Sequence, residues 1–403
     1  MAWNFVLASS AGVTIDILDG SYKQVQLEYQ RSDVSRAIVQ LDVDDDRALT
    51  LITQVAGATP RLYCYRDGVL KFAGFLTSIE QSADNEAQLT ATFEDGLALL
   101  RYRISDGTPD LPLEYFNQNS ANIIGSTSTV GSYPSLLSQA NASTPTGLAA
   151  GTITATTVTL DSLLINREVI LDRVLEISRM TGGPDLRVVP QAQGATLATL
   201  DVGPIYTATT PTISFGYGPG TAVNVLSVSQ QITPPQTRVL VVGNEVESWS
   251  TVTSAVINAE AGVGRWEVAE QRSDLQSTID CQNTADALVR TGWTQTISFT
   301  PDPAIAPSPL QDYNLGDPVR LTVFRGSIAA DATVRVNKIS VTIDNSGVET
   351  DHGVECEVGN AVVTAPAAPK GTNTATNTDA PLTTSPQAIT TVVESPTIRL
   401  FRK

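Results

Sequence analysis

The sequence predicts a mainly β (α+β) protein with two β-barrel-like modules that flank a mixed α/β insertion, followed by an extended C-terminal arm. Short alternating apolar runs, separated by turn residues, fill the first hundred residues. A similar block of strands returns near residue 312, and helix-type periodicity is clear in only two places. With 403 residues and 41% apolar content, the chain can build several domains with real cores.

The clearest strand pattern lies in 61–103. RLYCYR and VLKFAGFLTSIE are joined by Asp67-Gly68, a pair that tolerates the positive φ of a two-residue hairpin turn. QLTATF then alternates as a third strand. In the following DGLALLRYR, we expect Leu97, Leu99 and Leu100 to share one face of a short helix.

The second block lies in 312–358. Two strands are expected in YNLGDPVRLTVFRG and ATVRVNKISVTID, and GVECEV follows the turn at Asn345-Ser346-Gly347. We therefore expect two similar β modules in one chain.

The acidic run LDVDDDRA ends one of the strands expected before residue 61. A calcium loop needs a turn glycine and a distal glutamate at fixed spacing, and the glycine is missing here. We therefore interpret Asp42 and Asp44–Asp46 as a solvated strand end.

The middle of the chain is expected to mix loops, helices and strands. Residues 106–160 are rich in Ser, Thr, Asn and Gly and predict loops with little room for a core, ending in the strand TITATTVTL. A helix is expected from an N-cap at Asn166 to Gly182, and its apolar face follows the spacing of a helix. That face comprises Val169, Ile170, Val174 and Ile177. DLRVVPQ follows as a strand.

A second helix is predicted from the N-cap Ser273 to Arg290. Its expected buried face comprises Leu275, Ile279, Ala285, Leu288 and Val289. TISFGYGPGTAVNVLSVSQQI and RVLVVGN predict strands around a Gly-rich corner. The segment Ile297–Pro309 contains four prolines, which favours a rigid connector.

These patterns divide the chain into six segments. They are 1–105 for the first barrel module, 106–204 for the first part of the middle α/β domain, 205–245 for strands of the second barrel, 246–306 for the second part of the middle domain, 307–361 for completion of the second barrel, and 362–403 for the Pro/Thr-rich arm.

The charge and the cysteines restrict the function. A net charge of −17 argues against nucleic-acid binding as the main role, because an acidic surface repels phosphate. Cys64, Cys281 and Cys356 are too scattered for a disulfide framework or a zinc site, and a reducing cytoplasm during folding is expected. No cofactor or metal is predicted. No apolar run reaches the roughly 18 residues of a membrane span.

No catalytic constellation is visible, so we predict that the chain is not an enzyme. The one histidine, His352, is interpreted as an exposed hairpin residue. The glycine-rich run 216–221 lacks the ending of a phosphate loop. Glu245 and Glu247 lie near Trp249, where a sugar site is conceivable, but two carboxylates on one strand do not flank a substrate.

The C-terminal arm is predicted to bind a partner. Its Pro/Thr/Ala-rich composition cannot bury enough apolar surface to fold alone. It ends in TIRLFRK, where Ile398, Leu400 and Phe401 are candidate apolar anchors and Arg399 and Arg402 candidate partners of acidic groups.

Taken together, these segments resemble the tail-hub (minor tail, tail-tip) proteins of long-tailed bacteriophages, especially phages of actinobacteria. The likeness is carried by RDGVLKFAGFLTSIE with DGLALLRYR, by VILDRVLEISRMTGGPDLRVVP with ISFGYGPGTAVNVLSVSQQITPPQTRVLVVG, and by DYNLGDPVRLTV with RVNKISVTIDNSGVE. It stops before the Pro/Thr-rich arm. Each motif is common by itself, and the order and spacing of all of them carry the resemblance.

The resemblance implies a homotrimer with two tube-like β-barrels per subunit, the second assembled from separated segments. Three chains would present six similar barrels to the sixfold tail tube. The implied partners are the distal tail protein, the tape measure protein and tail-tip or fibre proteins, with DNA only in transit. The implied location is the tail tip of the virion, after assembly in the host cytoplasm.

The main alternative is a receptor- or carbohydrate-binding tail-tip protein. That function predicts exposed aromatic platforms, for which Trp3, Trp249, Trp266 and Trp293 are the candidates. A glycan hydrolase is a weaker third hypothesis.

Overall fold

A computed structural model describes residues 3–358, apart from 19, 21, 47, 49, 52–58, 83–87, 108–110, 181, 222, 273–274, 276 and 326–327. These residues belong to one compact unit, Met1–Thr364. The predicted partner-binding residues Ile398, Arg399, Leu400, Phe401 and Arg402 lie outside the described residues. None of the helices in the described part has the length and hydropathy needed to cross a membrane.

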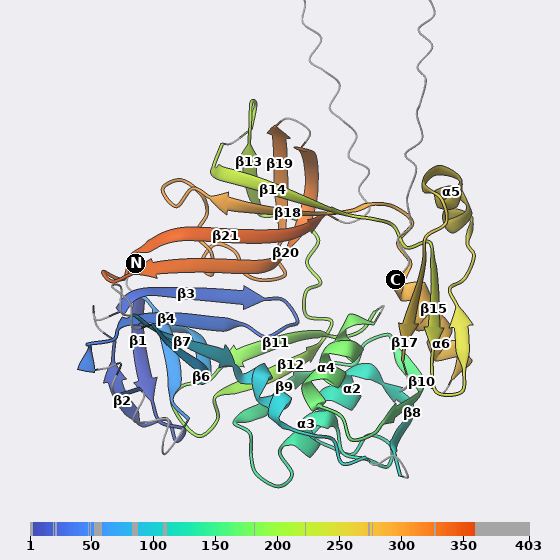
Figure 1. The fold of residues 1–403 in the computed structure, drawn as a ribbon, viewed down its shortest axis with the longest axis horizontal. Helices are drawn as coiled ribbons and strands as arrows, with labels where there is room; N and C mark the ends of the chain where they lie inside the picture. Colours follow the sequence, from blue (N-terminus) through green and yellow to red (C-terminus); the bar gives the residue numbers. More distant parts are fainter. Residues whose placement is uncertain are drawn as a thin grey trace, which may run out of the picture. The chain divides into compact units, whose positions relative to one another are not determined.

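The chain is mainly β, as predicted, and its largest sheet in the described part has 13 strands (Figure 1). They are β1 (Trp3–Ala8), β2 (Thr14–Ile17), β3 (Tyr22–Gln30), β4 (Arg36–Asp42), β5 (Arg61–Arg66), β6 (Val69–Ser82), β7 (Gln88–Asp95), β13 (Ile213–Tyr217), β14 (Val225–Thr233), β18 (Thr294–Pro301), β19 (Pro318–Arg325), β20 (Ile328–Asp344) and β21 (Glu349–Val358).

Two rows of four strands make up most of this sheet. The second row, β14-β18-β21-β20, continues into the first row, β3-β4-β7-β6, through antiparallel pairing of β20 with β3 (Figure 1). Alternate side chains of both rows share one apolar core, which includes Val25, Leu27, Ile339 and Val341. Among the described residues, no strand pairing closes either row into a barrel.

The local predictions for 61–103 are confirmed for the most part. Asp67 (φ 49°) and Gly68 (φ 78°) form the tight turn between β5 and β6. The helix that follows β7 is the 3₁₀ helix η1 (Gly96–Tyr102). Leu97 and Leu100 are fully buried in it, whereas Leu99 is only partly buried, because residues three apart share a face of a 3₁₀ helix.

Residues 106–160 contribute to a second core, so the prediction of loops with little core was wrong. They contain β8 (Leu113–Asn119), α2 (Ser120–Gly125), α3 (Leu136–Ala140) and β9 (Leu148–Ile153). The buried side chains Ile123, Ile124, Leu136 and Leu137 pack in this core. The expected strand TITATTVTL is instead split between β9 and β10 (Thr159–Ile165).

The first long helix, α4 (Ile170–Arg179), has its N-cap at Val169, three residues later than predicted. Residues before it are held in an extended conformation, because Ser105 N and Ile170 N donate to Glu168 O and Arg103 O (2.9 and 3.0 Å). The expected face is otherwise confirmed, since Ile170, Val174 and Ile177 are buried. The predicted strand follows as β11 (Asp185–Pro190), which pairs with β12 (Ala198–Gly203).

A small three-stranded sheet is inserted between β14 and β18. It has the order β16 (Glu247–Trp249), β15 (Arg238–Val242), β17 (Glu267–Gln271) and is accompanied by α5 (Ser254–Val263) and α6 (Thr278–Leu288). β15 therefore does not belong to the large sheet, although it was predicted as a strand of the second barrel. Conversely, Ile297–Pro301, predicted as a connector, lie in β18 and pair with β14 and β21.

The predicted buried face of α6 is confirmed only in part. Ser277 caps the helix, and the predicted cap Ser273 lies outside the described residues. Its buried side chains include Asp280, Cys281, Thr284 and Ala285, of which Ala285 was predicted, whereas the predicted Leu288 is 37% exposed. Ile279 is 58% exposed, and Leu275 is buried but precedes the helix.

Asp95, at the end of β7, is a buried carboxyl group with an unusual pKa. Its oxygens accept hydrogen bonds from Leu97 N and Ser35 N, both at 3.0 Å, so it caps η1 and holds the β3–β4 turn. Burial raises the pKa of Asp95 to about 7, although these hydrogen bonds oppose the rise.

Asp95 should therefore make the protein less stable as the pH rises. The folded state keeps a proton up to about pH 7 that the unfolded chain releases near pH 4. Between these values, the free energy of unfolding should fall by at most about 1.4 kcal/mol per pH unit because of this group. Asp95→Asn keeps an acceptor oxygen and should remove this part of the slope in urea unfolding at pH 4–8. Parallel pH curves for the two proteins would contradict the assignment.

Candidate functional site

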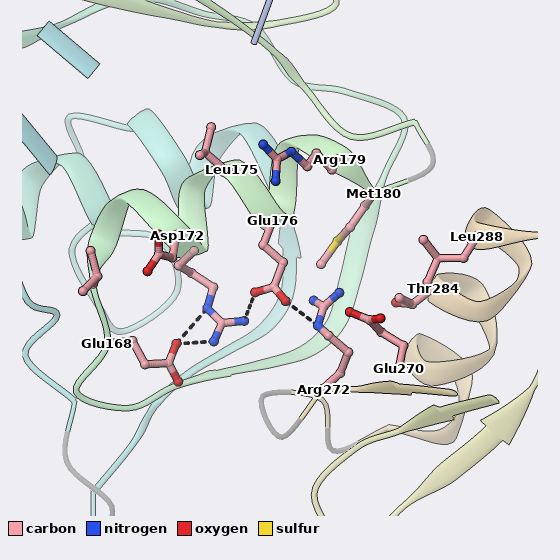
Figure 2. A pocket seen from close by; sticks show the side chains of 12 residues that line it. Glu168, Asp172, Leu175, Glu176, Arg179, Met180, Glu270, Arg272, Thr284 and Leu288 are labelled. Atoms are coloured by element: carbon pink, nitrogen blue, oxygen red, sulfur yellow. Dashed lines mark hydrogen bonds and ion pairs between the residues drawn. The ribbon is translucent and has the colours of Figure 1, made fainter. Parts of the chain in front are cut away.

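A groove of about 700 Å³ lies between α4 and the segment from β17 to α6 (Figure 2). Asp172, Leu175, Glu176 and Arg179 line one side, on the face of α4 opposite its buried apolar residues. Figure 2 shows Glu270, Arg272, Thr284 and Leu288 on the other side. Charged side chains of both signs therefore meet in this groove.

A chain of buried ion pairs crosses the groove. Arg173 Nε donates to Glu168 Oε2 at 2.9 Å, and the same guanidinium pairs with Glu176. Glu176 also pairs with Arg272 from the other side, as Figure 2 shows. Arg173 and Arg272 are each only 8% exposed, so their charges depend on these carboxylates for compensation. The ion pairs of Arg173, Glu176 and Arg272 thus form a buried polar seam that crosses the groove and links α4 to the segment after β17.

The chemistry of this groove does not point to catalysis. Its lining contains carboxylates and guanidinium groups but no cysteine, histidine, lysine or serine. Within the described residues, no cluster of His, Cys, Asp or Glu has the geometry of a metal site. The sequence analysis missed this groove, although acidic and basic residues spaced three to five apart at Glu168, Asp172, Arg173 and Glu176 could have indicated it.

A second buried polar cluster ties β1 and β5 of the large sheet to β21 of the second row. Arg66, at the end of β5, is 2% exposed and pairs with Glu349 of β21 at 2.7 Å. Trp3 Nε1 donates to the same carboxylate at 2.7 Å, and the guanidinium lies 5.7 Å from the Trp3 ring centroid. Arg66 also donates to Ser308 Oγ (2.6 Å) and to the carbonyl of Pro309.

His352 belongs to this cluster, so its interpretation as an exposed hairpin residue was wrong. It is 4% exposed on β21, and its Nε2 lies 2.8 Å from Glu349 Oε2. Burial tends to raise the pKa of Glu349, but hydrogen bonds from His352 and Trp3 and the charge of Arg66 outweigh it, so the pKa is lowered. No nucleophile is paired with His352 in the described structure, which fits a structural role.

The other residues singled out in the sequence are dispersed. Glu245 (φ 61°) lies in the turn before β16 and Glu247 within the strand, both exposed. Gly218 and Gly220 adopt positive φ at the corner between β13 and β14, as expected for a strand corner. Cys64, Cys281 and Cys356 are buried, and none forms a disulfide within the described part of the chain.

The tryptophans divide into two groups. Trp3 is buried at 6% exposure. Trp249, Trp266 and Trp293 are 45%, 43% and 52% exposed, and all lie on or beside the small sheet. The rings of Trp266 and Trp293 meet edge to face, with centroids 6.4 Å apart. This part of the surface has the exposed aromatic character that the alternative function predicts.

Comparison with known proteins identifies the fold. The chain is similar to the 43 kDa tail protein of prophage MuSo2 from Shewanella oneidensis, with a TM-score of 0.53, 12% identity, and coverage of 88% of this chain and 97% of that one. It is also similar to a tail protein from Neisseria meningitidis MC58, with a TM-score of 0.52, 12% identity, and coverage of 89% and 97%. No protein-family model and no curated protein matches the chain. The chain therefore shares, along most of its length, the fold of solved bacterial and prophage tail proteins.

Arg66 should be essential for stability because of the carboxylate that it neutralises. Arg66→Met leaves Glu349 buried without its cation, and we expect a loss of about 3–5 kcal/mol in the free energy of unfolding, measured by urea denaturation. Arg101→Met is the matched control, because it removes an ion pair with Glu94 in which the arginine side chain is 44% exposed. It should cost no more than about 1 kcal/mol. Equal losses for both variants would contradict this account.

Proposed function

We propose that this protein is the trimeric hub of a phage tail, of the kind found in long-tailed phages. More specifically, we assign it to the hub type of phages that infect actinobacteria. The single observation that carries the proposal is the repetition of one strand order within the chain. The second row runs β14-β18-β21-β20 and the first row β3-β4-β7-β6, so β14 corresponds to β3, β18 to β4, β21 to β7 and β20 to β6. The fold shared with tail proteins supports the same proposal.

The pairing patterns of the two rows agree residue by residue. The long strand β6 leaves its partner β5 at the pair Arg61↔Phe75 and continues along β7. The long strand β20 leaves β19 at Pro318↔Arg335 and continues along β21. Phe75 and Arg335 are therefore equivalent positions.

The irregularities of the ladders also coincide. The pairing of β6 with β7 shifts between Leu76 and Ser78, and that of β20 with β21 shifts between Val336 and Lys338. The β3–β4 ladder shifts between Tyr22 and Gln24, and the β14–β18 ladder between Val225 and Ser227. Bulges are specific features of a strand, so their coincidence supports two copies of one module in each chain.

Three such chains would place six equivalent modules around one axis, which suits a junction between a sixfold tail tube and a threefold tip. In this proposal, the modules complete tube-like β-barrels: the first lies in 1–105, and the second combines β13, β14, β18, β19, β20 and β21. The hub closes the tube, contacts the distal tail protein and the tip or fibre proteins, and leaves a channel for the tape measure protein and DNA. A channel wall rich in carboxylates would repel DNA, which agrees with the net charge of −17 per chain.

The C-terminal arm 362–403 is assigned to partner binding in the same proposal. Ile398, Leu400 and Phe401 would anchor it, and Arg399 and Arg402 would pair with acidic groups of a tip or fibre protein. Its composition supports this assignment, because it cannot form a core of its own.

The mass of the purified full-length chain tests the hub. Light scattering after size exclusion should give three times the mass of one 42.7 kDa chain. Truncation at residue 364 should leave this mass ratio unchanged, because the strand rows lie before it. A monomer at all accessible concentrations, or a dimer, would contradict the proposed function.

A second candidate function is binding of a receptor or carbohydrate by the small sheet, which the three exposed tryptophans favour. Trp266→Ala with Trp293→Ala should weaken binding of the trimer to host cell-wall polysaccharide by about 2 kcal/mol, because aromatic anchors dominate binding energy. Phe116→Ala, at an exposed aromatic residue of β8, is the matched control. Unchanged binding in the double variant, or absence of binding by the parent protein, would remove this candidate.

A further inference from the structure

At each end of the double row of strands, one strand edge has no paired neighbour among the described residues. The strand β14 pairs with β18 on one side only. On β6, the N–H of Leu76 still donates to Pro60 O (2.9 Å), but Ser78–Gln81 have passed the end of β5 and pair only with β7 among the described strands. Each edge presents backbone N–H and C=O groups that can pair with another strand.

The edge of β14 lacks the features that normally prevent strand addition. Its nine residues, VLSVSQQIT, contain no charged residue and no proline. Leu226 and Ile232 on it are 56% and 54% exposed. By contrast, the edge strand β2 has only four residues and carries Asp16. Proteins usually protect an exposed edge by shortness, charge or proline, so β14 has the character of a strand that receives a partner.

The repeat within the chain identifies that partner. The edge of β14 is equivalent to the edge of β3, and the edge of β6 to that of β20. Within one chain, β3 and β20 pair with each other. The free edge of β14 therefore corresponds to the β3 side of that junction, and the free edge of β6 corresponds to its β20 side. We propose that β14 of one copy pairs antiparallel with Ser78–Gln81 of the next copy. This inference rests on the proposed trimer and specifies how its copies are joined.

The equivalence also fixes the register of the proposed pairing. In the junction within the chain, Lys338 pairs with Gln30 and Ile339 with Tyr29. The bulge of β6 ends at Ser78 and the bulge of β20 ends at Lys338, so these two residues are equivalent. Ile79 and Ile339, which follow them, are then also equivalent. The strands β3 and β14 are both nine residues long, and each has its bulge directly after its first residue. Thr233 is therefore equivalent to Gln30, and Ile232 to Tyr29. Ile232 should therefore lie opposite Ile79 of the next copy, and Thr233 opposite Ser78.

The residues that would meet are chemically compatible. Ile79 is partly buried against the core of the large sheet, so an apolar neighbour extends that core. Ile232 would lose the exposure that it has in the single chain. In the next pair of the register, Gln231 would lie opposite Glu80. The side-chain amide of Gln231 can donate a hydrogen bond to the Glu80 carboxylate. The contact uses different surfaces on the two copies, which generates a ring when the rotation closes.

A second copy is a better occupant than another protein, because both halves of the junction occur in every chain. The two free edges of the strand rows then pair with each other, and neither row keeps a free edge in a closed ring.

Paired cysteines test this register directly. The double variant Ile79→Cys with Ile232→Cys should form disulfides between copies under mild oxidation, giving dimer and trimer bands on a non-reducing gel. Opposite residues in an antiparallel pair have Cα atoms about 4.5–5.5 Å apart, which a disulfide can span. The control, Ile79→Cys with Leu226→Cys, puts the second thiol six residues along the strand, roughly 20 Å away. The native cysteines are buried and should not react.

The possible outcomes separate this inference from the proposed function. Crosslinking in the test variant and not in the control supports the pairing. A trimeric mass with no crosslinking above the control overturns the pairing but leaves the hub intact. A monomeric mass overturns both.

Ile232→Lys provides a second test that does not depend on disulfide chemistry. A charged, exposed edge residue should prevent strand addition without affecting the single chain, because Ile232 is already half exposed there. We expect the association constant to fall by more than about tenfold, with the circular dichroism spectrum unchanged. Ile305→Lys, at an exposed residue outside the strands, should leave association unchanged. Equal association of the two variants would overturn the pairing.

Discussion

The pairing of β20 with β3 is the interaction on which this structure depends. It joins Lys338–Asp344 to Gln24–Gln30, which are separated by most of the chain. Because side chains alternate across a strand, this register brings Ile339, Val341 and Ile343 to the same core as Val25 and Leu27. A slip of one residue would turn these side chains to the other face of the sheet. The contact of Lys338 with Glu28 (3.5 Å) links the same two rows, and the buried pair Arg66–Glu349 links β5 to β21.

The rest of the chain is inserted around this double row without interrupting it. One insertion follows η1, and the other, with the small sheet, lies between β14 and β18, two strands that correspond to the directly connected pair β3 and β4. The seam formed by Arg173, Glu176 and Arg272 connects the two insertions through buried, compensated charges. The insertions thus form a layer of their own, and the exposed tryptophans belong to that layer, separate from the strand rows.

Local chemistry was predictable from the sequence, and long-range pairing was not. Asp67-Gly68 indicated its hairpin because the turn geometry depends on two residues alone. The core in 106–160 was missed because the polar residues there suggested loops. In the structure, they instead bond to nearby backbone groups and fix short elements. Asn119 and Ser135 cap α2 and α3, and Asn141 donates to Leu148 O (2.9 Å). The burial of His352 depends on Glu349, Trp3 and Arg66, and no local pattern brings these together. Two similar β modules were expected from the sequence, but the correspondence between their individual strands is visible only in the ladders and bulges. The residues of the predicted arm lie outside the described part, so that hypothesis remains a prediction.

The central claim is that two modules per chain form one ring of six at the end of a tail. Electron microscopy of the purified full-length assembly, viewed down its axis, tests this claim most directly. The account predicts threefold symmetry with six similar densities around a central opening, joined by continuous sheet from copy to copy. A single chain without a ring, or a trimer whose strand rows lie away from the axis, would contradict it.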